Sequence, residues 1–162
     1  MGRAAIDQLL YSLDRAFEGE ESRWHGLVRN LTSLEPERWD DVPAGCVRSA
    51  LAIVEHVGGA LRVYDSQAFG DGSVHWDRPE SVAAFPANRG SDAALGWLRD
   101  GHNQFREHVA ALPDDQDLLA PRRSPQGPER QTRWVVTTMI EHELYHAGEI
   151  NHVRLLFHGN DG

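Results

Sequence analysis

The chain has 162 residues, of which 40% are hydrophobic and 25% charged, and its formal net charge is −9 at pH 7. This size and balance are typical of a globular protein with one core, so we expect residues 1–162 to form a single domain. The negative charge argues against a nucleic-acid partner, because phosphates would be repelled. No apolar run is long enough to cross a bilayer, and the first residues lack the layout of a signal peptide. The sequence therefore predicts a cytoplasmic protein that does not bind a membrane.

The cysteine content is minimal. Cys46 is the only cysteine, which excludes an internal disulfide framework and a multi-cysteine metal cluster. A lone cysteine is most often a small buried side chain, and we expect that role here.

Helical periodicity begins close to the start of the chain. Apolar residues keep one helical phase as far as residue 31, and Gly19 does not shift that phase. We expect one long first helix that is bent near Gly19. The apolar positions are Ile6, Leu9, Leu10, Leu13, Phe17, Trp24, Leu27, Val28 and Leu31.

Three further helices are expected. The second runs from about Val47 to Ala68 and is followed by a Gly- and Pro-rich loop over residues 70–90. The third begins at Ser91, which we expect to be its N-cap, and continues to about Leu112. A second long loop over residues 112–131 precedes the fourth helix, from about Gln131 to Phe157. With almost no alternating strand pattern, this arrangement predicts an all-α fold, a four-helix bundle with long loops between helices 2 and 3 and between helices 3 and 4.

The fourth helix carries two histidines at metal-ligand spacing. His142 and His146 are four residues apart, so their side chains point within about 40° of each other on a helix. Both imidazoles could reach one ion at about 2.1 Å. They also lie in an apolar stripe, where unsatisfied imidazoles would be costly. The alternative is a pair of hydrogen-bonded core histidines without an ion.

A third ligand must come from elsewhere, and the candidates are His152, His102 and His56. His102 lies on the apolar stripe of the third helix, whereas small residues around His56 would leave room for an ion. Periodicity slightly favours His102, and spacing does not decide between the two.

Residues 142–146 also read H-E-x-x-H, the signature of zinc peptidases, with His152 at the place of a third histidine. In the extended motif a glycine lies three residues after the second histidine and breaks the helix. Glu149 occupies that position here, and Gly148 comes one residue early. There is no downstream methionine and no convincing strand to hold a peptide. A zinc peptidase is therefore a distant alternative, and we expect Glu143 to point to the flank of the metal-facing stripe, toward a neighbouring helix or solvent.

Two segments of the chain resemble the DinB/YfiT-like superfamily. "TRWVVTTMIEHELYHAGEINHVRLLF" resembles the last helix of that family, which carries two histidines separated by three residues and followed by x-Gly-Gln or similar. "SALAIVEHVGGALRVYDSQAFG" resembles the family's second helix, which carries a lone metal-binding histidine. The resemblance implies a four-helix bundle with a divalent metal, zinc or nickel among others, bound by His56, His142 and His146.

The resemblance also suggests a function. Relatives include mycothiol-dependent maleylpyruvate isomerase and bacillithiol S-transferases, which activate a low-molecular-weight thiol on the metal, and many members are homodimers. We therefore expect a metal-dependent thiol S-transferase or isomerase that acts on a small electrophile. The alternative is a metal-containing bundle that binds or senses without turnover.

Three other residues are candidates for roles at the site. Glu149 replaces the glutamine common in the family, and it could orient a ligand, bind the ion or simply be solvated. Arg122 and Arg123, in the second long loop, either meet an anionic substrate or are solvated.

Overall fold

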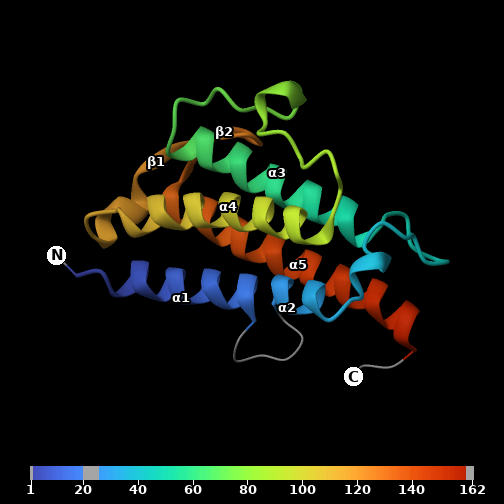
Figure 1. Cartoon of the computed structure of the whole chain (residues 1–162). Helices are drawn as coiled ribbons and strands as arrows, with labels where there is room; N and C mark the ends of the chain where they lie inside the picture. The colour runs from blue at the N-terminus through green and yellow to red at the C-terminus, as the bar shows by residue number, and fades with distance from the viewer. Residues whose placement is uncertain (1, 20–25, 160–162) are drawn as a thin grey trace.

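The structure is a computed structural model that describes residues 2–19 and 26–159. It is built almost entirely from helices, with one small hairpin, so the prediction of a mainly helical chain is confirmed (Figure 1). The α-helices are α1 (Ala4–Glu18), α2 (Leu27–Thr32), α3 (Ala50–Ala68), α4 (Ser91–Ala110) and α5 (Thr132–His158), and the strands are β1 (Pro121–Ser124) and β2 (Gly127–Gln131). Short 3-10 turns occur at Pro36–Arg38, Pro79–Ser81 and Asp115–Leu119.

The four long helices pack around one apolar core. α1 packs against α4 and α5, and α3 packs against the same two helices, so the four helices together enclose the core. Phe17 of α1, Leu61 of α3, Phe105 of α4 and Met139 of α5 are all fully buried there. α3 is buried on nearly every side, which is why its apolar residues do not form a narrow stripe. Among the helices in the described ranges, none combines the length and apolar content that a membrane span requires.

The first helix is not continuous, so the prediction of one long bent helix is wrong. α1 ends at Glu18, because Gly19 adopts a left-handed φ of 75° and donates its N–H to the Arg15 carbonyl. Gly26 lies directly against Gly19: a Cβ on Gly19 would be 2.7 Å from the Gly26 Cα. The backbones of Gly19 and Gly26 are thus in contact, and α2 continues near the line of α1 (Figure 1). Because α1 and α2 both pack on α5, their apolar residues keep one helical phase across the break. Trp24, which was part of that predicted helix, lies outside the described residues.

The connection between α4 and α5 contains a hairpin that the sequence pattern did not predict. β1 and β2 pair antiparallel, with Arg122 opposite Arg130, and Gly127 has the positive φ of 100° that the turn requires. Neither strand alternates apolar and polar residues, because the hairpin lies on the surface. The hairpin ends where the Thr132 N–H bonds to the Ala120 carbonyl, at the first residue of α5.

The start of α3 and the environment of Cys46 also differ from expectation. α3 begins at Ala50 because Ser49 caps it, its side chain accepting a hydrogen bond from the Ala52 N–H. Cys46 lies just before this cap and is half-buried against the core.

Candidate metal centre

α5 presents its two histidines from an unbroken helix. The helix continues through Gly148 to His158, so no bend returns His152 toward the pair. His152 is exposed, whereas His146 is 2% exposed and His142 half-buried. The third histidine of the extended peptidase motif is therefore not available to the pair.

α3 supplies the histidine that meets them. His56 Nε2 lies 3.2 Å from His142 Nε2, which in turn lies 3.2 Å from His146 Nε2. The three ligand atoms all fall within 4.8 Å of one another. A tetrahedral ion with metal–nitrogen distances of about 2.1 Å separates two of its nitrogen ligands by about 3.4 Å. The triad thus has the donor type and spacing that one divalent ion requires.

The surroundings keep these imidazoles neutral. Burial lowers the pKa of His142 to about 4, with further lowering from His146, His56 and Arg48. Burial also lowers the pKa values of His56 and His146. Neutral imidazole is the form that ligates metals, so the triad is competent to bind at pH 7. The His142 Nδ1 atom is buried without a hydrogen-bond partner among the described residues, and its Nε2 is the atom that meets the other two imidazoles.

Glu149 orients His146 instead of joining the triad. Its Oε2 atom accepts a hydrogen bond of 2.8 Å from His146 Nδ1, which leaves Nε2 free for an ion. Arg48 holds the carboxylate in place by donating from Nε to Oε1 at 2.9 Å and from Nη2 to Oε2 at 3.1 Å. Burial opposes ionisation of Glu149, but the hydrogen bonds from Arg48 and His146 outweigh it and lower the pKa of this carboxyl. The sequence predicted that Glu149 lies near the site, but no pattern in it indicated that Arg48 pairs with this carboxylate.

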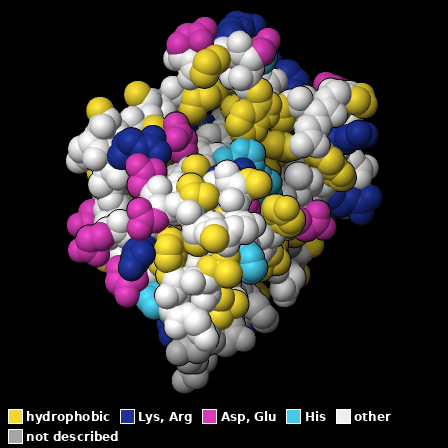
Figure 2. Space-filling model, turned by 90° about the vertical axis from the view of Figure 1, so that its right-hand side faces the viewer, with side chains coloured by type: hydrophobic (Ala, Val, Ile, Leu, Met, Phe, Trp, Pro, Cys, Tyr) yellow, Lys and Arg dark blue, Asp and Glu magenta, His cyan; other side chains and the backbone are white. Residues whose placement is uncertain are grey.

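Aromatic side chains border the triad. The Trp76 ring stacks on His56 with 6.0 Å between ring centroids and 19° between planes. Tyr145 meets His146 edge-on at 4.9 Å and is largely exposed. Figure 2 shows one face of the molecule on which histidine side chains reach the surface among hydrophobic ones. The triad is therefore partly buried, and its aromatic neighbours Trp76 and Tyr145 are exposed to solvent.

His102, the competing third ligand, lies elsewhere. It is buried, stacks on Phe17 at 3.7 Å between ring centroids, and its Nδ1 lies 2.9 Å from Glu143 Oε1. Glu143 is fully buried toward α4, and its Oε2 has no hydrogen-bond partner among the described residues. Burial raises the pKa of Glu143, an effect that the neighbouring His102 opposes. The glutamate of the H-E-x-x-H sequence therefore serves a different histidine, on another side of α5 from the triad.

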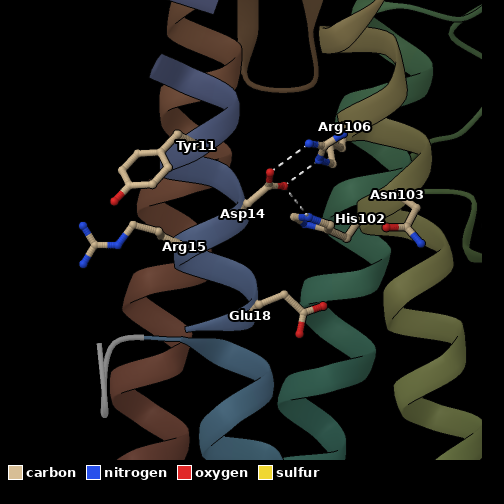
Figure 3. Close-up of a pocket in the computed structure, with 7 residues that line it drawn as sticks. All are labelled: Tyr11, Asp14, Arg15, Glu18, His102, Asn103 and Arg106. Atoms are coloured by element: carbon tan, nitrogen blue, oxygen red, sulfur yellow. Dashed lines mark hydrogen bonds and ion pairs between the residues drawn. The ribbon is translucent and has the colours of Figure 1, made fainter. Parts of the chain in front are cut away.

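A polar cleft of about 390 Å³ opens beside this pair, between α1 and α4 (Figure 3). Asp14 points across it toward α4, where it accepts hydrogen bonds from Arg106 Nε at 2.5 Å and Nη2 at 2.8 Å. The same carboxylate lies 4.0 Å from His102 Nε2, and Glu18 forms an ion pair with Arg99. Both carboxylates are thus paired with arginines, and the cluster ties α1 to α4 and α5.

The loop arginines also have structural partners. Arg123 donates to the backbone carbonyls of Gln67, Gly70 and Asp71, which follow or end α3. Arg122 donates to the Thr132 hydroxyl and lies over the Phe69 ring. Both arginines therefore attach the hairpin to the end of α3 and to the start of α5.

Comparison with known protein families agrees with the geometry. The model of the DinB superfamily matches residues 16–150, a span that includes all three histidines of the triad. The chain belongs to the DinB superfamily. A search of curated proteins finds no match to it. Membership of the DinB superfamily supports the reading of the triad as a metal centre, because the match extends over the helices that bring the three residues together.

Glu149→Ala tests whether this carboxylate positions His146. Losing an outer hydrogen-bond partner of a metal-bound histidine lowers metal affinity by about 10–100-fold, and we expect that loss here. A competition titration of metal-free protein against a chromophoric chelator measures it. The control is Glu141→Ala, which removes an exposed glutamate of the same helix and should leave affinity unchanged. Equal affinity in both variants would show that Glu149 does not position the ligand.

Glu143→Gln tests the separation of the H-E-x-x-H glutamate from the triad. We expect metal affinity within a few-fold of wild type, because Glu143 faces His102. The free energy of unfolding of the metal-free protein should fall by about 1–3 kcal/mol, since the buried Oε2 atom becomes an NH2 group with no acceptor among the described residues. Denaturant unfolding and the same chelator titration give the two numbers. A large loss of metal affinity at unchanged stability would place Glu143 at the metal instead.

Proposed function

We propose that this protein is a metal-dependent thiol S-transferase or isomerase that acts on a small electrophile. The observation that carries the proposal is the convergence of three neutral imidazole nitrogens, from His56, His142 and His146, beside aromatic side chains at the surface. When bound there, a divalent ion such as zinc or nickel would lower the pKa of a thiol at its open coordination position.

The chain's own residues favour an anionic partner for that position. The three histidines are neutral, so they do not offset the charge of a divalent ion, and Glu149 is engaged by Arg48. A thiolate is therefore a better fourth ligand than a neutral molecule. Mycothiol is the thiol that the family resemblance suggests, and a homodimer remains a prediction.

The residues would divide the work of the reaction. The triad would hold the metal ion that activates the thiol, while Trp76 beside His56 and Tyr145 beside His146 would border the approaching electrophile. In an S-transfer the thiol sulfur forms a bond to the electrophilic carbon, the leaving group departs with its electron pair, and the thiol proton passes to solvent.

A reconstitution experiment tests the proposal. Protein stripped with a chelator and then loaded with zinc or nickel is mixed with mycothiol and 1-chloro-2,4-dinitrobenzene, and thioether formation is followed by absorbance. We expect a rate that requires the loaded metal and is lost in His142→Ala. His152→Ala is the matched control, because it removes an exposed histidine of the same helix, and it should retain the rate.

Other outcomes separate the alternatives. Equal rates with stripped and loaded protein, or with His142→Ala, would contradict metal-dependent thiol transfer. Stoichiometric metal without any metal-dependent rate across a panel of thiols and electrophiles would favour the non-catalytic binding or sensing role. Cleavage of unstructured peptides by the zinc-loaded protein would favour the peptidase alternative.

A further inference from the structure

Two adjacent glycines, Gly58 and Gly59, lie within α3, two and three residues after His56 of the triad. A Cβ on Gly58 would be 2.2 Å from the Trp97 ring, so this ring packs directly on bare backbone. A Cβ on Gly59 would be 3.8 Å from the Trp76 ring, which is ordinary contact. Glycine inside a helix costs about 1 kcal/mol relative to alanine, so this pair opposes helix stability. Gly58 thus makes room for the Trp97 ring, and Gly59 leaves open space beside the Trp76 ring.

The space between those rings is an aromatic slot of about 200 Å³. We use "aromatic slot" for the cavity lined by Glu55, Gly59, Trp76, Pro79, Val82, Ala83, Ala84, Phe85 and Trp97. Its lining comes from α3, α4 and the loop between them. Glu55 is the only charged side chain in this lining, and Arg89 pairs with it at 3.6 Å.

The inner wall of the slot is fixed in place. Trp97 Nε1 donates to the Ala83 carbonyl at 3.2 Å, and Phe85 meets Trp97 edge-on with 5.1 Å between ring centroids. The Arg62 guanidinium lies 3.9 Å from the centre of the Trp97 ring and donates to the Trp97 carbonyl. Trp76, another part of the lining, is 46% exposed and stacks on His56. Trp76 thus borders both the slot and the triad.

We infer that the aromatic slot binds a single uncharged aromatic ring, carried by the electrophile that reacts at the neighbouring triad; this rests on the proposed function. A cavity of about 150 Å³ with apolar walls holds benzene, so the slot's volume suits one ring with a small substituent. The Trp76, Phe85 and Trp97 rings of the lining offer aromatic contacts to a flat ring. A charged ring would lose hydration without gaining a free partner, because Glu55 is already paired with Arg89 and the other lining side chains are apolar.

The position of Trp76 links binding to reaction. Trp76 lines the slot and also stacks on His56, so the slot and the triad are neighbours. The preferred substrate is therefore an aromatic compound with its electrophilic carbon directly on the ring or one bond from it.

A titration of metal-free protein with 4-fluorobenzyl alcohol tests this inference. Fluorine NMR of the probe and the indole N–H signals of ¹⁵N-tryptophan-labelled protein report binding. We expect saturable binding, with shifts of the Trp76 and Trp97 signals, and binding of 4-fluorobenzoate at least about tenfold weaker because its carboxylate is not paired in the slot.

Gly59→Leu should block the slot, because a side chain at this position projects into it, and we expect at least about a tenfold loss of affinity for the alcohol. Gly96→Leu is the matched control: it is a helical glycine whose added Cβ meets no atom within 4 Å, and it should bind the probe normally. Trp76→Ala is a second variant that removes a half-exposed wall without emptying the core, and it should also weaken binding. Absence of binding, or equal binding by Gly59→Leu and Gly96→Leu, would overturn the inference.

This result is separable from that of the proposed function, because the titration contains neither metal nor thiol. If the probe does not bind while thiol transfer is found, the inference about the slot fails alone. If the probe binds while no metal-dependent rate is found, the proposed reaction fails alone.

Discussion

Three imidazole nitrogens, one from α3 and two from α5, meet at one point where the two helices pack together. His56 and His142, and likewise His142 and His146, bring lone-pair atoms to within 3.2 Å of each other in a partly buried position. Burial keeps all three rings neutral, as the lowered pKa values of His56, His142 and His146 show. Taking such polar atoms out of water is unfavourable unless something satisfies them. A shared divalent ion satisfies all three at once, and it would join the two helices that carry them.

Successive residues of α5 serve two different polar clusters. His142 and Glu143 point to different sides of the helix, the first to the triad and the second to His102. Each cluster ends in an ion pair with an arginine: Glu149 with Arg48 near the triad, and Asp14 with Arg106 in the cleft. The match to the peptidase signature thus arises because His142 and Glu143, which are adjacent in sequence, belong to two separate clusters. In this bundle Glu143 holds a buried histidine of α4, and another glutamate, Glu149, holds the His146 imidazole of the triad.

The sequence predicts the helices well where apolar periodicity reflects burial, as in α4 and α5. It fails at Gly19, because α2 packs on the same helix as α1 and so preserves the periodicity across a break. The hairpin escapes detection because its strands lie on the surface and carry no apolar alternation. Spacing alone reveals the pair His142 and His146 but not their partner, since His56 and His102 both sit at helix positions that face inward. The choice of His56 came from the family resemblance; small residues suggested only that there is room beside it, and in the structure Gly58 makes room for the Trp97 ring.

The most direct test of this account is the metal stoichiometry and affinity of His56→Ala beside those of His102→Ala. We expect wild-type protein to bind one divalent ion per chain and His102→Ala to bind it with similar affinity. His56→Ala should lose more affinity than the about 10–100-fold that removing an outer hydrogen-bond partner costs, because only two imidazoles would remain. If His56→Ala kept the ion while His102→Ala lost it, the triad described above would not be the metal centre.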